Sequence, residues 1–370
     1  MVDLIDNSRG NGYVATDKQM AEIRRMATKH GPGNASEFVA EMMTKITTEN
    51  GYGSVGSRVS QNYHGLNQLA TPPGLPQNTD EYGYIFFTRP LMRLTYDNLI
   101  AERTLMPMMH TDKFSMFRAV RAYLDPVGAK TFYPSGLVDP KNPFITLMTN
   151  LCTTMSGWPN PQVDTYSSKA GIYKEQWSMY DGSSKIMGGF TLNATFKNII
   201  NDPISYLINT WGTYGSLVYD GTIRPYPEAA VMRYIDYQTR IIRLVLDSNH
   251  EYVQKWAACG TAIPTVNNLG SSFDYDISKP VNPELDDVSV TFTCNIAMYN
   301  DPIIILEFNR SVAAFNPAMS DRNRDTYMRK LARKEIPLFN YLAYPRVDEK
   351  TSEMQWWVPI ETYRLMEGGL

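Results

Sequence analysis

Pairs of acidic residues are the first candidates for chemistry in this sequence. One pair is Asp274 and Asp276, and a second is Asp286 and Asp287. Carboxylates at such spacing could act as a general acid and base or as calcium ligands. Short acidic side chains are also frequent in turns, where they hydrogen-bond to the backbone. We interpret both pairs as turn acids.

The remaining candidate residues lack the partners that catalysis or metal binding requires. Four histidines are far apart, with neither HxH nor HxxxH spacing: His30, His64, His110 and His250. Three cysteines are odd in number and have no CxxC spacing: Cys152, Cys259 and Cys294. Residues 51–56 are rich in glycine but lack the Lys-Ser/Thr of a phosphate loop. The sequence therefore predicts a protein that is not an enzyme and has no metal or cofactor site.

Composition indicates an ordered, globular chain that does not bind nucleic acid tightly. The 370 residues are 43% hydrophobic and 12% aromatic, which is enough for a sizeable core. The formal net charge of −3 lacks the basic excess expected of a protein that binds phosphates tightly. No apolar run reaches the roughly 20 residues of a membrane span, and residues 1–10 do not resemble a signal peptide. We expect assembly in a reducing cytoplasm and no membrane partner.

The first half of the chain is predicted to hold two regions. Residues 1–80 contain helical periodicity at 17–29 and 35–49, followed by a Gly-, Ser- and Pro-rich stretch that is either an extended arm or a surface loop. Residues 81–168 form an accessory α+β region. It has a strand ending at Pro90 and helical patterns at 112–124 and 143–156.

Residues 169–310 are predicted to form an antiparallel β domain with one packed helix. Apolar and polar residues alternate over 190–197 and again over 288–295, as in strands with one buried face. Asp202 and Pro203 are typical of a helix start, and the helix ends near Gly221. Further strands are expected at 234–246, 251–259 and 271–277. Residues 311–370 form a C-terminal extension.

Three features within 189–295 occur in the order found in a known family. The strand at 190–196 leads to a helix centred on Trp211, and Pro225 and Tyr226 then precede a hairpin that closes on Pro264 and Thr265. A strand containing Tyr275 and Asp276 and an acidic lead into Val-x-Val-x-Phe at 288–292 complete the order. This segment, a little under a third of the chain, resembles the tail tube proteins of contractile phages and related injection machines.

The resemblance implies an antiparallel β-sandwich or barrel that assembles into a hexameric ring of the tail. Residues beyond the segment are similar in extent to the additions of a baseplate tube-initiator ring. The implied partners are further copies of the chain, neighbouring tube, baseplate or sheath proteins, and double-stranded DNA passing non-specifically through the lumen. The implied location is the virion tail. Core anchors are expected at Phe196, Leu207, Trp211 and Phe292.

The polar sides of the two alternating strands are the candidate channel wall. Small neutral polar side chains keep a channel wall hydrated without presenting cations to the DNA phosphates. The predicted lumen-facing residues are Thr191, Asn193, Thr195, Lys197, Ser289, Thr291, Thr293 and Asn295. The alternative from the residues alone is the solvent-exposed side of an ordinary sandwich.

Two other functions stay open at this point. One is a neck or head-completion protein that joins head and tail. The other is a tail-associated cell-wall hydrolase, which would need two carboxylates in an aromatic cleft. The basic segment 320–334 is predicted to be a solvated or subunit-contacting helix, and the alternative there is contact with DNA.

Overall fold

The computed structural model describes residues 82–182, 186–267, 269–273, 287–339 and 341–367. The chain divides into two compact units, Met1–Thr79 and Asp80–Leu370. The helices predicted at 17–29 and 35–49, and the arm or loop predicted at 51–80, lie outside the described residues. The described residues all belong to the second unit.

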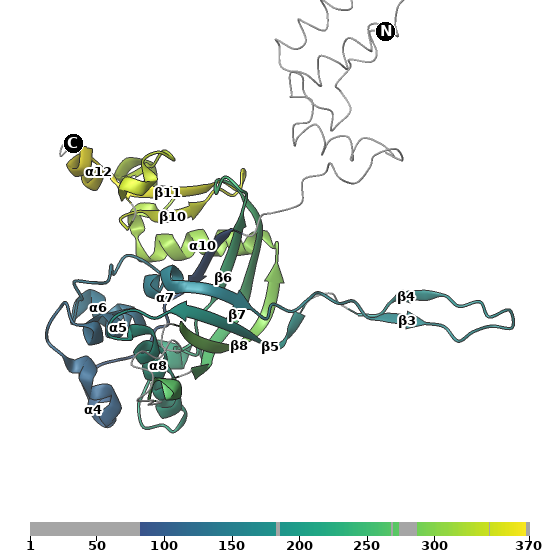
Figure 1. Cartoon of the computed structure of the whole chain (residues 1–370), viewed down its shortest axis with the longest axis horizontal. Coiled ribbons are helices and arrows are strands. Elements are labelled where there is room, and N and C mark those ends of the chain that lie inside the picture. Colours follow the sequence, from purple (N-terminus) through teal and green to yellow (C-terminus); the bar gives the residue numbers. More distant parts are fainter. Residues whose placement is uncertain (1–81, 183–185, 268, 274–286, 340, 368–370) are drawn as a thin grey trace, which may run out of the picture. The chain divides into compact units, whose positions relative to one another are not determined.

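Helices and strands alternate irregularly along this unit (Figure 1). The strands are β1 (Gly83–Phe87), β2 (Cys152–Ser156), β3 (Thr165–Ser167), β4 (Ser178–Tyr180), β5 (Ile186–Lys197), β6 (Ile241–Leu246), β7 (Val253–Asn267), β8 (Asp287–Tyr299), β9 (Met328–Lys330), β10 (Tyr344–Val347) and β11 (Met354–Pro359). The α-helices are α4 (Tyr96–Ala101), α5 (Met116–Leu124), α6 (Pro126–Thr131), α7 (Thr146–Leu151), α8 (Pro203–Tyr219), α9 (Pro227–Val231), α10 (Pro302–Phe315), α11 (Arg324–Tyr327) and α12 (Ile360–Glu367). The 3₁₀ helices are η2 (Arg103–Met109), η3 (Leu269–Phe273), η5 (Pro317–Met319) and η6 (Ile336–Phe339).

An antiparallel sheet with the strand order β1-β6-β7-β8-β5-β2 is the centre of the unit. Its two outer strands approach closure through the segment that precedes α7. The Ile145 amide donates to the Phe87 carbonyl oxygen over 2.8 Å, and Thr88 and Phe144 form an antiparallel bridge. The sheet is therefore barrel-like, and the predicted α+β class with an antiparallel barrel and a packed helix is confirmed.

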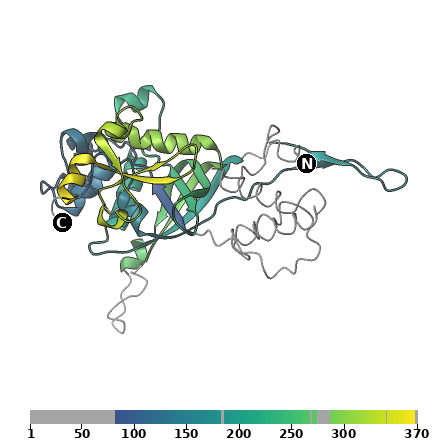
Figure 2. The ribbon, with the colours of Figure 1, turned by 90° about the horizontal axis from the view of Figure 1, so that it is seen from above.

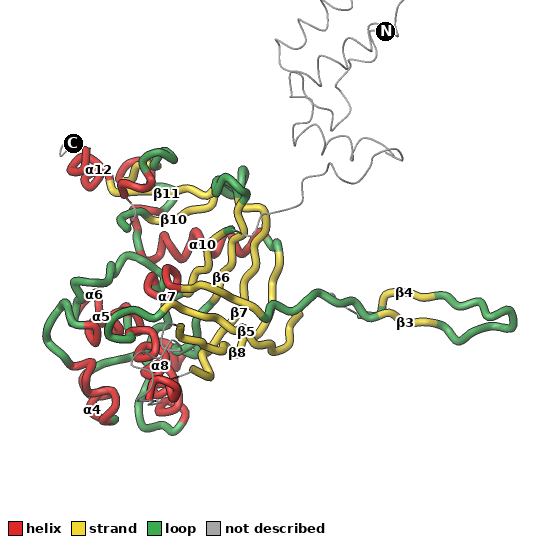
Figure 3. The backbone as a smooth tube through the Cα atoms, viewed as in Figure 1, coloured by secondary structure: helices red, strands yellow, loops and turns green. Residues whose placement is uncertain are grey.

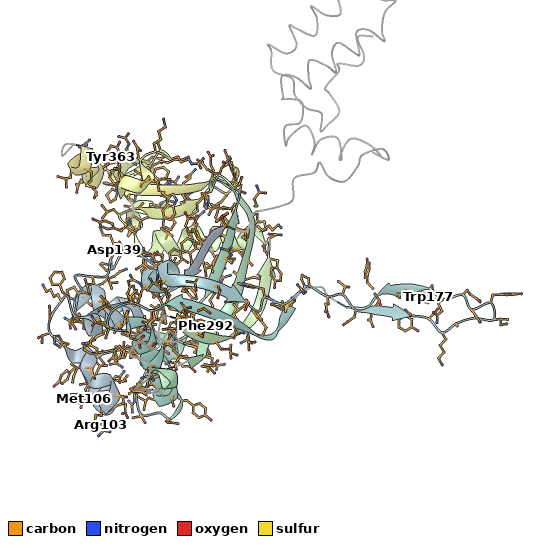
Figure 4. The ribbon with its side chains drawn as sticks, viewed as in Figure 1. Arg103, Met106, Asp139, Trp177, Phe292 and Tyr363 are labelled. Atoms are coloured by element: carbon orange, nitrogen blue, oxygen red, sulfur yellow. The ribbon has the colours of Figure 1, made fainter. Side chains whose placement is uncertain are left out.

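One face of the sheet packs on a core that includes α5 and α8. Alternation places Leu192, Ala194 and Phe196 of β5 on this face, and Phe292 of β8 lies beside them with no exposed surface. Figure 4 labels Phe292 within the sheet region. Trp211 of α8 is 1% exposed, and its indole N–H donates to the Tyr237 carbonyl oxygen over 2.6 Å.

The opposite face is covered only in part. Phe86, Ile242 and Ala258 lie on it, because their chain neighbours Phe87, Ile241 and Cys259 belong to the first core. They pack in a second apolar cluster with α10, β10 and β11. Figure 3 shows the red helix α10 beside the yellow strands at this place. The C-terminal extension is thus part of the same packed unit.

Helix α8 begins and ends where proline and glycine dictate. Pro203 occupies the first turn, where its missing N–H costs no hydrogen bond. Asp202 precedes it in the left-handed region (φ 47°), and the Ser205 hydroxyl donates to its carboxylate over 2.7 Å. The carboxylate makes no hydrogen bond to the helix backbone, so the predicted N-cap is correct in position only. Gly221 follows the helix at φ 74°, which favours glycine.

Several predicted elements differ from the observed ones because tertiary pairing decides them. Residues 143–156 split into α7 and β2, since 152–156 pair with β5. The strand expected over 234–246 is confined to β6, and the strand expected over 251–259 continues to Asn267 as β7. Residues 271–273 lie in η3 rather than in a strand, and 274–277 fall outside the described residues.

Regions that the sequence predicted to be separate contribute strands to the same sheet. Residues 81–168, expected as an accessory region, contribute both of its outer strands, β1 and β2. The strand expected to end at Pro90 is β1.

The basic segment 320–334 does not form the single helix expected from its composition. It contains the short α11 and then β9, which pairs with β11. Three of its six cations have acidic partners in the described part of the chain. Nitrogen–oxygen distances are 2.8 Å for Arg324 to Asp321, 2.6 Å for Lys330 to Glu353 and 3.9 Å for Arg329 to Glu335. Pairing with β11 fixes this backbone as a strand, which overrides its helical pattern.

Candidate functional site: the polar face of the sheet

The structure brings the eight predicted wall residues together on one face of β5 and β8. The two strands pair directly, with Thr191 opposite Thr293 and Asn193 opposite Thr291. Their alternate residues are buried in the first core, so these side chains point to the opposite side. Among the eight, Thr195 and Thr291 are half-buried and the other six are exposed.

Two further strands extend this surface on either side. Thr261 of β7 lies opposite Asn295, and Thr154 and Ser156 of β2 lie opposite Thr195 and Asn193. We call the combined surface the polar face. It consists of Thr154, Ser156, Thr191, Asn193, Thr195, Lys197, Thr261, Thr265, Asp287, Ser289, Thr291, Thr293 and Asn295.

Hydrogen bonds between strands hold the hydroxyl and amide groups of this face in place. The Thr291 hydroxyl donates to the Asn193 side-chain oxygen over 2.9 Å. The Thr265 hydroxyl donates to the Thr291 carbonyl oxygen over 3.1 Å, and the Asn295 amide donates to the Thr261 hydroxyl over 3.4 Å. Cross-strand pairs of this kind stabilise a sheet by about 0.2–1 kcal/mol each.

The polar face is almost free of charge. Lys197 and Asp287 are its only ionisable residues, and they oppose each other where β5 ends and β8 begins. The other members offer only hydroxyl and amide groups, and the apolar Ile263 and Val266 of β7 lie opposite Thr293 and Thr291 beside them. Such a surface binds water well but has no array of cations for phosphates.

Buried polar contacts hold α8 against the buried face of this sheet, opposite the polar face. The Tyr214 hydroxyl, which is fully buried, donates to the Asp236 carboxylate over 2.5 Å and accepts from the Arg93 amide over 2.9 Å. Burial, followed by the hydrogen bond to Asp236, raises the pKa of Tyr214 well above its ordinary value. Burial likewise raises the pKa of the Asp236 carboxyl. With Trp211, these contacts set the position of the helix that supports β5 and β8.

A second buried carboxylate was not anticipated from the sequence. Asp125 has no exposed surface and accepts hydrogen bonds from the Tyr133 hydroxyl, the Tyr226 hydroxyl (2.8 Å) and the Gly128 amide (2.8 Å). Tyr226 is part of the Pro-Tyr loop singled out above, so this loop is tied to the start of α6. An aspartate immediately before a proline was a signal for a helix cap at this position.

The parts contributed by β2 and β7 were also missed. Because 143–156 were interpreted as a helix, Thr154 and Ser156 were not assigned to the polar face. The consecutive β-branched residues Thr153 and Thr154 favour a strand there. No alternating pattern marks Thr261 and Thr265, because β7 changes register with β8 between Pro264 and Val266.

The described part of the chain contains no group of three or more His, Cys, Asp or Glu residues placed to hold a metal ion. The described residues also include no helix with the length and hydropathy needed to cross a membrane. Cys152, Cys259 and Cys294 are free thiols.

Three of the solved structures that this chain resembles each match less than half of it. One is the anti-feeding prophage cap, described as a tube-terminating cap, at 11% identity over 40% of this chain and 79% of that chain (TM-score 0.25). A second is the PVC sheath/tube terminator of an extracellular contractile injection system in its extended state, at 8% identity over 40% and 85% (TM-score 0.23). A third is the PVC sheath-tube complex in the extended state, at 10% identity over 46% and 95% (TM-score 0.26).

Comparison by sequence gives a match over nearly the whole chain. No curated protein matches it significantly. A family model described as "Putative phage tail tube protein" matches residues 23–370, which include both the polar face and the C-terminal extension. The chain therefore belongs to this family of phage tail tube proteins.

Proposed function

We propose that this chain is a structural subunit of a contractile tail, forming a hexameric ring whose lumen is lined by the polar face and conducts double-stranded DNA. The observation that carries the proposal is the uncharged hydroxyl and amide surface that runs across β7, β8, β5 and β2. The role is structural rather than enzymatic. The ring is assembled in the host cytoplasm and resides in the virion tail, next to tube, baseplate or sheath proteins.

Electrostatics supports a neutral wall for a passing polyanion. Each cation that contacts DNA releases counterions, so attraction multiplies with the number of contacts and weakens as salt rises. A ring repeats each side chain once per subunit. Threonine, serine and asparagine at the wall avoid this multiplied attraction, and the opposed Lys197 and Asp287 offset each other.

Sheet geometry supports ring formation. Strand β2 is an outer strand, paired with β5 on one side. Outer strands of soluble proteins are normally covered or paired, because their free backbone groups promote association. A neighbouring subunit at β2 would continue the polar face around a closed ring.

Charge placed on the polar face tests the proposal. Thr291→Arg should permit assembly but slow DNA release and lower infectivity, because six arginines would face the DNA. Six phosphate contacts correspond to about a 10³-fold loss of affinity between 50 and 200 mM salt, so higher salt should restore much of the release rate. Thr291→Asp should have a milder effect.

The matched control is Thr326→Arg, at an exposed threonine of α11 away from the polar face. Release is followed by dye fluorescence after triggering purified virions. Equal release by Thr291→Arg, Thr291→Asp and Thr326→Arg would refute the lumen assignment.

A further inference from the structure

A β-ribbon leaves the sheet between β2 and β5. We call residues 159–182 the arm. Its strands β3 and β4 pair only with each other among the described residues. Figures 1 and 2 show the ribbon standing clear of the other described elements, and Figure 4 labels Trp177 on it. Large apolar side chains are exposed along it, from Tyr166 (50%) and Trp177 (58%) to Ile172 (94%) and Tyr173 (91%) near its tip.

The arm has a defined internal structure. The Ser168 amide donates to the Trp177 carbonyl oxygen over 2.9 Å, and the Asp181 amide donates to that of Asp164 over 2.8 Å. At the tip, the Gly171 amide donates to the Glu175 carbonyl oxygen over 3.0 Å. The arm therefore presents its side chains in fixed directions.

The root of the arm is anchored in the sheet. The Trp158 ring lies 6.1 Å from the ring of Phe190 and 6.1 Å from that of Tyr299. The Tyr299 hydroxyl donates to the Pro159 carbonyl oxygen over 2.6 Å. The strands that bear the arm, β2 and β5, belong to the polar face.

The two sides of the arm differ in chemistry. Strand register puts Tyr166 opposite Met179, and the Trp177 ring lies 5.9 Å from the Tyr166 ring, so these three form one apolar side. The other side carries Thr165, Ser167, Ser178 and Tyr180, and the two serine hydroxyls are hydrogen-bonded over 2.8 Å. A one-sided apolar ribbon of this kind is suited to lie along another surface.

Energetics favour a protein partner. An isolated two-stranded hairpin is at best marginally stable in water, so a contact that covered its apolar side would stabilise this arm. Taking a typical 150–250 Å² for each aromatic side chain, the Tyr166 and Trp177 side chains of the apolar side leave roughly 250 Å² exposed. That is about a third of the roughly 800 Å² that one partner contributes to a standard interface.

We propose that the apolar side of the arm, formed by Tyr166, Trp177 and Met179, docks on a second copy of this chain, the adjacent subunit of the ring. The inference rests on the proposed ring, because the arm grows from β2, the outer strand at which the next subunit would continue the polar face. This contact enlarges the interface between neighbouring subunits at the β2 edge. The hydroxyl-bearing side stays in contact with solvent.

Photo-crosslinking in full-length assembled particles tests which molecule is touched. A benzophenone amino acid at position 177 should yield a covalent dimer of this chain, and the same group at position 180, on the opposite side of the arm, should yield far less. A crosslink from position 177 to a different tail protein, or only within one chain, would overturn the proposal.

An assembly assay gives an independent readout. Trp177→Ser combined with Tyr166→Ser should raise the subunit concentration needed for assembly by about 30-fold or more, because buried Trp and Tyr anchors dominate interface energies. Tyr180→Ser, at 81% exposure on the other side, is the matched control and should assemble like the wild type. Both variants should melt like the wild-type subunit, since these side chains lie outside the core clusters.

These experiments distinguish a failure of the arm inference from a failure of the lumen assignment. If rings form normally with the double serine variant while Thr291→Arg retards DNA, the arm inference fails and the proposed function stands. If position 177 crosslinks a second copy but the Thr291 variants behave alike, the arm contact stands and the lumen assignment fails.

Discussion

Removal of the Trp211 side chain is expected to destabilise the subunit more than a change at any exposed tryptophan. Trp211 is 1% exposed, packs in the first core cluster and donates its indole N–H to the Tyr237 carbonyl oxygen over 2.6 Å. Truncation of a buried tryptophan to alanine costs about 3–5 kcal/mol through lost burial and the cavity left behind. For a unit of this size, we expect the melting temperature to fall by roughly 6–15 °C.

A conservative variant separates packing from hydrogen bonding. Trp211→Phe keeps an aromatic ring but leaves the Tyr237 carbonyl without its donor, at a cost of about 1–3 kcal/mol. Trp177→Ala is the matched control, because the Trp177 side chain is 58% exposed and should change the free energy of unfolding by less than about 0.5 kcal/mol.

Urea unfolding of the unassembled subunit, followed by fluorescence and circular dichroism, measures the three variants. The reasoning would be refuted if Trp211→Ala unfolded at the wild-type midpoint. It would also be refuted if Trp177→Ala lost as much stability as Trp211→Ala, since burial would then not decide the effect.

Two other predictions concern the buried acid–tyrosine contacts. Asp125→Asn should cost about 2–4 kcal/mol, since an amide cannot accept all the bonds that Tyr133, Tyr226 and the backbone donate to the carboxylate, and urea unfolding would measure it. Burial, together with a neighbouring aspartate, raises the pKa of Tyr133, Tyr214 and Tyr226 above the ordinary 10.0. Their contribution to stability is therefore complete below pH 10 and is lost as the pH rises further, because unfolded tyrosines ionise first. Unfolding between pH 8 and 11 should show this loss, and Tyr133→Phe should reduce it.

Strands β5 and β8 of the polar face were the most predictable part of the fold. Alternation over 190–197 and 288–295 is a local property that follows from one buried and one wet side, so both strands could be found without knowing their partners. Helix α8 was equally accessible, since Pro203 and Gly221 mark its ends through their own backbone preferences.

Elements whose conformation depends on a distant partner were predicted less well. Residues 152–156 carry a pattern compatible with a helix and become a strand by pairing with β5. Residues 328–330 likewise become β9 by pairing with β11, although their charge pattern suggested a helix. The sequence marks Asp125 as a helix cap before Pro126, but not the hydrogen bond from Tyr226, which lies 101 residues later in the chain.

The sequence by itself determined which side chains of β5 and β8 would be buried and which would be exposed to water. Successive side chains of a strand point to opposite faces of the sheet in any surroundings. The sequence also indicated the tail tube family, through the order of its strand, helix and hairpin features. Only the tertiary structure decided that the polar face extends across β2 and β7, and that the C-terminal extension covers part of the same side of the sheet. Which distant strands pair with each other is decided by packing and hydrogen bonding across the fold, which no local pattern encodes.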